Sequence, residues 1–369
     1  MRVQAIVLST AYAGTGSTGP IEILGKSMLD WVLMSVSGYP HKAVTLDEGE
    51  DYLTRIKPFV DPAYEYTVVL YTDTPLITKK TVEDALNLAY TSNRTVLKMT
   101  RGFIFKTDYL LSAAKIYTDT PFYFEEEDFV TAFNFKQVGL IADILKNRIL
   151  NYHMENGVHF EDLNTAFIGC DVKLGRGVTI GPGNIIRGKT VIKDNVRIHT
   201  GCVIEDCVID EGASIDSSRL FHSYIGKGTT VGPFANLRAD NVIGDRVKLG
   251  DFVELKNCRI GNGCKLSHLT YAGDVVMGEN CNVGAGVVFA NYDGKSKHAT
   301  VVGNNVFVGS SSTLVAPVRL GDGAFVAAGS VINDDLPAGA LGIGRARQVV
   351  KEGWKNNRYS PPPPEKPRE

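Results

Sequence analysis

An aliphatic residue recurs at every sixth position through much of the second half of this 369-residue chain, usually followed by glycine or an acid. No other feature restricts the fold as strongly, because such self-similarity requires a stacked architecture in which each unit buries its apolar face against its neighbours. With small slips in spacing, the repeating positions are Ile168, Leu174, Ile180, Ile186, Ile192, Ile198, Ile204, Ile209, Ile215, Ile225, Val231, Leu237, Ile243, Leu249, Leu255, Ile260, Leu266, Met277, Val283, Phe289, Val302, Val308, Leu314, Leu320, Val326 and Ile332.

Three six-residue units make one triangular coil of about 18 residues, with the aliphatic side chain pointing inward and glycine permitting the corner. Residues 168–332 then hold about nine coils, which at a strand spacing of ~4.8 Å form a prism roughly 40 Å tall. Of the 38 glycines, 29 lie from residue 168 onward. The pattern resembles the left-handed parallel β-helix of the hexapeptide-repeat acyltransferases.

Composition narrows the class of protein. Hydrophobic residues at 44% and charged residues at 22% exclude a disordered or collagen-like chain. No run approaches 18 uncharged apolar residues, so we expect no membrane span, and the start MRVQAIVLST predicts a β-strand instead of a signal peptide. A cytoplasmic protein is therefore expected.

Charge and cysteine placement bear on possible ligands. Residues 1–167 contain 15 basic and 21 acidic residues, and residues 168–369 contain 24 and 20, a mildly basic balance that suits small phosphorylated ligands better than nucleic acid. The six cysteines include no C-x-x-C pair, and their spacing matches no zinc site. Cys202, Cys264 and Cys281 each follow an aliphatic position by four residues, which predicts a packing role.

Counting along the coils brings unusual outward residues together. Taking coil starts at Ile225 and Ile243, Arg238 and Lys256 are each thirteen residues into a coil, so they should stack in one column ~5 Å apart. Two stacked cations repel unless an anion such as phosphate lies between them, although both side chains could equally extend into solvent. By the same count Glu254 and Tyr271 share a column.

One histidine stands out among the seven. His268 follows the inward Leu266 by two positions, so its ring should point out of the prism, within about a coil of Glu254 and of the cation column. An imidazole with a pKa near 6.5, oriented by a carboxylate, is suited to remove a proton from an attacking amine. A zinc hydratase site would need three converging histidines, and His199, His222 and His268 are not at matching coil positions.

From about Gly232 to Trp354 eight ordered blocks go beyond the repeat: GPFANLR, GDFVELKN, SHLTYAGD, NVGAG, ANYDGKSKH, VFVGSSSTLVAPV, AAGSV and KEGW. They resemble the acetyltransferase domain of the bifunctional enzyme family that makes UDP-N-acetylglucosamine. The resemblance implies acetyl transfer from acetyl-CoA to the amine of glucosamine-1-phosphate, in cell-wall precursor synthesis. It also implies a homotrimer with active sites between neighbouring prisms.

The matching blocks imply roles for individual residues. His268 is similar to the family's general base, with Glu254 beside it, and the Ala285 N–H would serve as oxyanion donor. Sugar-phosphate ligands are implied at Arg238, Lys256, Tyr271, Asn282 and Lys297. The acetyl-CoA side is implied at Ala285, Asn291, Tyr292, Ser310, Ala328, Arg345 and Trp354, the last in a tail segment reaching a neighbour's site.

The first half predicts an α/β domain. Residues 3–9 and 67–73 are typical of buried parallel strands, and residues 79–91 of a helix between strands. Apolar residues at helical spacing from Val138 to Tyr152 predict a connecting helix. We therefore expect a Rossmann-like, nucleotidyltransferase-like domain at 1–137, a linker helix at 138–167, the β-helix at 168–346 and a tail with a disordered end at 347–369.

This first domain is shorter than the family's and departs from its pattern. The loop Leu8–Ile23 keeps Gly14, Gly16 and Gly19, but it lacks the family's Arg and has Ile21 where the resemblance implies Lys. LYTDTPLI resembles the family's LYGDVPLI, which makes Asp73 a candidate Mg²⁺ ligand, and Asn134 weakly matches a second. Without the family's Arg and Lys, a bound triphosphate loses the cations that mainly stabilise its negative charge.

Several readings remain open at this point. The leading one is a glucosamine-1-phosphate N-acetyltransferase whose first domain serves folding or regulation. A bifunctional enzyme that also forms UDP-N-acetylglucosamine from UTP is a second. An acetyltransferase for another amino sugar is a third, and a non-enzymatic scaffold or sugar-nucleotide sensor is a fourth.

Overall fold

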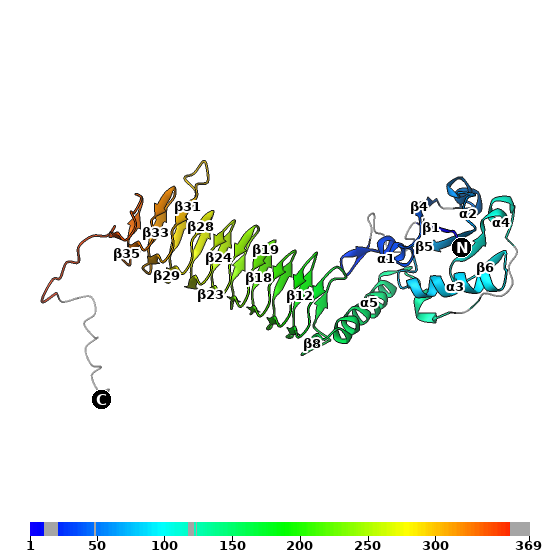
Figure 1. Ribbon diagram of the computed structural model, residues 1–369, viewed down its shortest axis with the longest axis horizontal. Helices are drawn as coiled ribbons and strands as arrows, with labels where there is room; N and C mark the ends of the chain where they lie inside the picture. The colour runs from blue at the N-terminus through cyan, green and yellow to red at the C-terminus, as the bar shows by residue number, and fades with distance from the viewer. Residues whose placement is uncertain (11–20, 48, 117–121, 123, 355–369) are drawn as a thin grey trace, which may run out of the picture.

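The protein consists of an α/β domain at one end of a long β-helix (Figure 1). This computed structural model describes residues 1–10, 21–47, 49–116, 122 and 124–354. The glycine-rich segment with Gly14, Gly16 and Gly19, and the end of the tail predicted to be disordered, lie outside the described residues.

A five-stranded mixed sheet of order β4-β1-β5-β7-β6 forms the centre of the N-terminal domain. β1 pairs in parallel with β4 and β5, whereas β7 runs antiparallel to both β5 and β6. The strands are β1 (Val3–Thr10), β4 (His41–Leu46), β5 (Tyr66–Tyr71), β6 (Val96–Lys98) and β7 (Phe103–Lys106), and a small hairpin joins β2 (Glu22–Ile23) to β3 (Lys26–Ser27). The predicted α/β domain with two buried parallel strands is confirmed.

Helices flank this sheet and connect it to the β-helix. They are α1 (Met28–Ser35), α2 (Tyr52–Ile56), α3 (Lys79–Thr91), α4 (Thr107–Ser112) and α5 (Phe135–Glu155), with 3-10 turns η1 (Lys57–Phe59) and η2 (Glu126–Phe129). α3 has the predicted bounds, and the Thr78 side chain caps it by accepting from the Thr81 N–H. α5 buries Ile141 and Leu145 in the cluster that contains Met28 and Trp31, and it buries Leu150 in the core of the β-helix.

The β-helix is a left-handed triangular prism with three parallel sheets. The first face contains β10 (Lys173–Leu174), β13 (Val191–Ile192), β16 (Val208–Ile209), β19 (Ser223–Ile225), β22 (Asn241–Ile243), β25 (Arg259–Ile260), β28 (Val275–Met277), β31 (Thr300–Val302) and β34 (Val318–Leu320). The second contains β8 (His159–Phe160), β11 (Thr179–Ile180), β14 (Arg197–Ile198), β17 (Ser214–Ile215), β20 (Thr230–Val231), β23 (Lys248–Asp251), β26 (Lys265–His268), β29 (Asn282–Val283), β32 (Phe307–Val308), β35 (Phe325–Val326) and β37 (Leu341–Gly342). The third contains β9 (Phe167–Ile168), β12 (Ile185–Arg187), β15 (Val203–Glu205), β18 (Arg219–Phe221), β21 (Asn236–Leu237), β24 (Glu254–Lys256), β27 (Tyr271–Gly273), β30 (Val288–Ala290), β33 (Thr313–Val315) and β36 (Val331–Ile332).

The prism begins earlier than residue 168. β8 at His159–Phe160 pairs with β11, so strand pairing starts within the segment predicted as linker helix, and α5 itself ends at Glu155. The repeat did not reveal this first strand because Phe160 precedes Ile168 by eight residues and so falls outside the six-residue spacing, although its side chain is buried in the same core. The last strand, β37, lies inside the predicted boundary.

The structure shows two reasons for the glycines of the β-helix. Several have positive φ, as a corner requires, among them Gly232, Gly263 and Gly286. Gly250 and Gly226, which follow inward aliphatic residues, do not have positive φ; an added Cβ would instead collide with the backbone of the next coil, at Ser267 and Gly244 respectively. Several corners with positive φ are formed by other residues, including Phe234, Phe252 and Leu269. Gly226 and Gly250 therefore allow successive coils to approach one another closely.

One continuous apolar core fills the prism. The repeating aliphatic side chains line it, and Ile225, Leu237 and Leu255 are examples that have no exposed surface. The sulfurs of Cys202, Cys264 and Cys281 are buried in the same core, which confirms their packing role. Across the part of the chain that the structure covers, no helix combines the length and apolar character needed to cross a membrane.

Candidate active site

Successive turns of one edge of the prism stack five of its residues in a column: Asp251, His268, Ala285, Ser310 and Ala328. Asp251 and His268 are register partners in β23 and β26. Backbone bonds then link the corners, from Gly286 N–H to the His268 carbonyl, from Ser311 N–H to that of Ala285 and from Gly329 N–H to that of Ser310. We call this set the corner column.

His268 points outward from this column, as predicted, and is exposed. Its Nδ1 lies 3.5 Å from Asp251 Oδ2, so Asp251 is the carboxylate beside the ring. Glu254, predicted for that place, instead has its Oε1 3.2 Å from Arg238 Nη1. The prediction of Glu254 as the partner of His268 does not match this geometry, because the two side chains leave different faces of the prism, β24 and β26.

Counting could have found Asp251. It is eight residues after Ile243, and His268 is eight residues after Ile260, so the count that stacks Glu254 on Tyr271 also stacks Asp251 on His268. Asp251 lies in the block GDFVELKN, but the resemblance gave a role in that block to Glu254 and Lys256 alone.

Three cations gather on the neighbouring face. Arg238 directly follows β21, whose register with β24 places it opposite Lys256, so the predicted column is confirmed. The adjoining Lys297 ammonium group lowers the pKa of Lys256 by direct contact and by repulsion, and the Arg238 charge lowers it further. The Asp274 carboxylate offsets only part of this effect, so Arg238, Lys256 and Lys297, here called the cation cluster, keep an excess of positive charge.

Lys297 reaches this cluster from the loop that interrupts the repeat between β30 and β31. Asp293 shapes the loop by accepting from the backbone N–H groups of Ser296 and Lys295, each at 2.7 Å, and from His298 Nε2 at 2.8 Å. These hydrogen bonds lower the pKa of Asp293, and the bond from the Ser296 N–H has the largest effect. A bridge between Tyr292 and Lys297 closes the loop.

Buried polar contacts fix the floor of the site. Asn291 is buried, and its Nδ2 donates to Asp274 Oδ2 at 2.6 Å while its Oδ1 lies 3.5 Å from the Tyr271 hydroxyl. A Cβ added at Gly273 would lie 2.5 Å from Asn291 Nδ2 and 2.7 Å from the Tyr271 hydroxyl, so a larger residue here would displace these two side chains. Tyr271 stacks on Glu254, as predicted.

The remaining predicted site residues lie further along the prism. Asn282, in β29, is in register with Lys265 and Phe307, on the face that carries His268. Tyr292 is exposed and its hydroxyl donates to the Gly294 carbonyl at 2.7 Å. Arg345 Nη1 donates to the Ala328 carbonyl at 2.9 Å, which extends the corner column by one residue. Trp354 is exposed at the last described residue.

Three backbone donors in the corner column are free within the described residues: the N–H groups of Ala285, Ser310 and Ala328. Most coil N–H groups, in contrast, bond to the next coil. Because Gly286 bonds to the His268 carbonyl, the free Ala285 N–H lies one coil from the imidazole. A free N–H beside a base can stabilise negative charge on a reacting oxygen.

The candidate metal ligands of the N-terminal domain are both engaged within the protein. Asp73 is 3% exposed and forms a two-pronged ion pair with Arg101, at 3.2 Å from Nε to Oδ1 and 2.6 Å from Nη2 to Oδ2. The same guanidinium lies over the Tyr71 ring, 4.0 Å from its centroid. Asn134 caps α5 by accepting from the Gln137 N–H at 3.0 Å.

The residues present therefore do not fit a Mg²⁺ site. A carboxylate already neutralised by arginine and an amide oxygen used as a helix cap leave no set of hard oxygen ligands facing one point. Within the described residues, no cluster of three or more His, Cys, Asp or Glu could hold a metal ion. His199 and His222, considered above for zinc, contact Ser214 and Asp206 instead.

The β-helix is similar in sequence to known proteins. Residues 162–260 match the model described as GMPPB C-terminal domain, and residues 299–334 match bacterial transferase hexapeptide (six repeats). The bifunctional protein GlmU of Clostridium acetobutylicum is 47% identical over 218 residues, which are 59% of this chain and 48% of that protein. GlmU of Clostridium tetani is 48% identical with the same coverage.

The chain thus spans about half the length of the curated relatives it matches. A solved structure of a UDP-N-acetylglucosamine acyltransferase aligns with 49% of this chain and 69% of its own at 16% identity, with a TM-score of 0.29. The resemblance to the bifunctional family, read above from eight sequence blocks, is confirmed over the matched residues.

Proposed function

We propose, from the kinship of its β-helix with the bifunctional GlmU proteins, that this chain transfers an acetyl group from acetyl-CoA to the amine of glucosamine-1-phosphate. One observation carries the proposal. An exposed histidine with a carboxylate partner lies on one edge of the prism, and an under-neutralised cation cluster lies on the face next to it. An amino sugar phosphate offers its amine to the histidine and its phosphate anion to the cation cluster.

The cation cluster is the proposed phosphate site. Lys256 is repelled by Lys297 and Arg238, and a phosphate among them would turn these repulsions into charge-assisted hydrogen bonds. Glu254 holds the Arg238 guanidinium from one side and leaves the other nitrogens as donors. Tyr271 and Asn282 are proposed contacts of the sugar.

His268 is the proposed general base. Its Nδ1 lies beside the Asp251 carboxylate, which favours a proton on that nitrogen and leaves Nε2 to accept the proton from the attacking amine. The free Ala285 N–H would donate to the acetyl oxygen as negative charge develops on it.

Acetyl-CoA would supply the acetyl group as an activated thioester. Its proposed place is along the corner column below His268, where Ala285, Ser310 and Ala328 present small side chains on successive coils. Arg345 ends this line with a cation suited to a phosphate of the donor. Asn291 and Tyr292 lie at the loop beside it, and Trp354 is the proposed contact from a neighbouring chain.

One further feature supports a homotrimer whose active sites lie between neighbouring prisms. Phe234, Phe252 and Leu269 form an exposed apolar stripe at successive corners, the last two directly after Asp251 and His268. The two phenylalanine rings stack with centroids 5.4 Å apart. An exposed apolar stripe beside a proposed site supports its burial against a second copy of the chain. We assign the protein to the cytoplasm and to cell-wall precursor synthesis on the same kinship.

The test is CoA release with glucosamine-1-phosphate as acceptor. We expect release that depends on this acceptor and falls with glucosamine, which lacks the phosphate. A higher rate with another amino sugar phosphate would transfer the proposal to that acceptor. Failure to bind acetyl-CoA at all would favour the scaffold or sensor reading.

Uridylyl transfer with Mg²⁺, the second activity of a bifunctional enzyme, is not favoured by the N-terminal domain. Asp73 is already paired with Arg101, and Asn134 is a helix cap. We infer that this domain serves folding or regulation. Sustained pyrophosphate release from UTP and N-acetylglucosamine-1-phosphate would overturn that inference.

A further inference from the structure

A cavity of about 370 Å³ lies where the N-terminal domain, α5 and the first coils of the β-helix meet. Its walls come from α1, the segment before α3, one side of α5 and the turn around Cys170. Figure 1 shows α1 and α5 at this junction. None of the proposed acetyl-transfer residues lines the cavity, so it belongs to a different site.

His153 gives this cavity a chemical identity. The residue is only 4% exposed and lines the cavity from α5. Among the described residues, none lies within hydrogen-bond reach of its ring nitrogens, although its ring meets the edge of Tyr152 at 5.3 Å between centroids. In the part of the chain that the structure describes, the buried side-chain nitrogen and oxygen atoms without a hydrogen-bond partner are Thr72 Oγ1, Thr300 Oγ1 and Ser330 Oγ, so the His153 ring nitrogens are still accessible. Because His153 lines the cavity, a ligand group there can form a hydrogen bond with this imidazole.

The ring is neutral at neutral pH, because burial lowers the pKa of His153. A neutral imidazole offers one N–H donor and one nitrogen acceptor. It is thus suited to a hydroxyl group, which can donate to the ring or accept from it.

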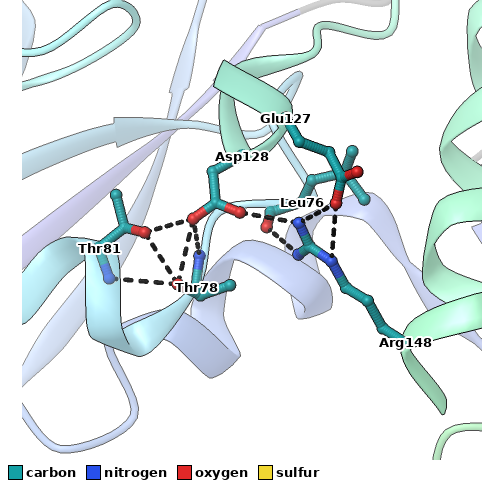
Figure 2. A network of polar contacts seen from close by, with 6 residues as sticks. All are labelled: Leu76, Thr78, Thr81, Glu127, Asp128 and Arg148. Atoms are coloured by element: carbon teal, nitrogen blue, oxygen red, sulfur yellow. Dashed lines mark hydrogen bonds and ion pairs between the residues drawn. The ribbon is translucent and has the colours of Figure 1, made fainter. Parts of the chain in front are cut away.

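The charged residues at the cavity are already satisfied. Figure 2 shows the Arg148 guanidinium held by Glu127, Asp128 and the Leu76 carbonyl, with distances of 2.7, 2.8 and 2.6 Å. Lys79 pairs with Glu83 at 3.6 Å. Burial raises the pKa of the Cys170 thiol to about 11, so it too is neutral. The described lining therefore offers no unpaired charge, and a charged ligand would find no counter-ion.

The rest of the wall is apolar and partly aromatic, with Trp31, Met34 and Tyr152 among the lining side chains. Rings and a thioether favour contact with another aromatic ring. The volume falls within the range typical of small-molecule sites, which are also common at domain junctions.

We propose that this cavity binds a small uncharged aromatic molecule carrying one hydroxyl group, which hydrogen-bonds to His153. The ligand contacts the N-terminal domain, α5 and the β-helix together, so its binding stabilises the junction between them. The site is independent of acetyl transfer, and its test does not depend on that activity.

Phenol is the probe, and toluene is its counterpart without a hydroxyl. Cys170 reports occupancy, because it is the one partly exposed thiol of six and the other five are buried internal controls. Trp31 provides a second signal in a Trp354→Phe background, since the chain has two tryptophans. We expect phenol to slow alkylation of Cys170 and to change Trp31 fluorescence in a saturable way, binding about fivefold more tightly than toluene.

Variants connect the preference to His153. His153→Phe should abolish the difference between phenol and toluene, His153→Gln should keep part of it, and the exposed His159→Phe should leave it unchanged. Unaltered far-ultraviolet circular dichroism and an intact Trp31 signal would show that the variants fold. If His153→Phe does not fold, His153→Gln provides the test. Equal binding of the two probes to the wild-type protein, or no protection of Cys170, would overturn the proposal.

Discussion

The two halves of the molecule each place arginine beside a carboxylate, with opposite consequences. In the N-terminal domain, Arg101 neutralises the buried Asp73 with two bonds and stacks on Tyr71. On the β-helix, Arg238 has one bond to Glu254 and faces the cations Lys256 and Lys297. The charges of the first group are balanced within the protein, whereas the second group keeps an excess of positive charge that an anion would neutralise.

This difference separates a structural charge pair from a binding site. A buried and fully paired carboxylate has no capacity left for a ligand, and breaking the pair costs stability. An exposed cluster of like charges costs little while solvated and gains free energy when an anion arrives. Chemistry is therefore expected on the β-helix.

The largest effect is expected for His268→Ala. Loss of a general base should lower kcat for acetyl transfer by ~10²-fold or more, with less change in KM. CoA release followed with a thiol reagent measures it. His159→Ala, an exposed histidine on the first coil, is the matched control and should keep wild-type kinetics. Near-normal kcat in His268→Ala would remove His268 from the mechanism.

Removing one cation of the cluster should act on substrate binding. Lys256→Met should raise KM for glucosamine-1-phosphate by ~10-fold or more, because a charge-assisted hydrogen bond to phosphate is lost. Lys248→Met, on another face of the prism, serves as control. An unchanged KM in Lys256→Met would mean that the phosphate binds elsewhere.

The two carboxylates near the site, Asp251 and Glu254, should affect different kinetic constants. Asp251→Asn should lower kcat about threefold to tenfold, since the imidazole loses the group that orients it. Asp251→Glu should restore part of that loss, and Glu254→Gln should mainly raise KM by loosening Arg238. The opposite pattern, with Glu254→Gln lowering kcat and Asp251→Asn silent, would make Glu254 the orienting group.

The smallest effect on acetyl transfer is expected for Arg101→Met. Asp73 would be left buried without its partner, which should lower the free energy of unfolding of the N-terminal domain by about 2–4 kcal/mol. Thermal unfolding measures this loss, and acetyl transfer should stay at the wild-type rate. Lys98→Met on the neighbouring strand β6 is the control. A collapse of acetyl transfer in folded Arg101→Met would connect the two halves functionally.

The six-residue period was sufficient to predict the prism, the inward side chains and the pairing of Arg238 with Lys256, because all follow from a constant coil length. The same count also stacks Asp251 on His268, whereas residue type alone does not distinguish Asp251 from Glu254, since both are carboxylates within reach along the chain. The pair of Asp73 with Arg101 depends on how β5, β6 and β7 are arranged, and no local pattern encodes that arrangement. His153 reads from sequence as one more helical residue, and only the packing of α5 against α1 and the first coils leaves its ring without a partner.

The most direct test assays one preparation of the protein for both transfers. We predict CoA release with acetyl-CoA and glucosamine-1-phosphate, together with no pyrophosphate release above background from UTP, N-acetylglucosamine-1-phosphate and Mg²⁺. Sustained pyrophosphate release without acetyl transfer would contradict the account, because it would place the chemistry in the half where the charges are already paired.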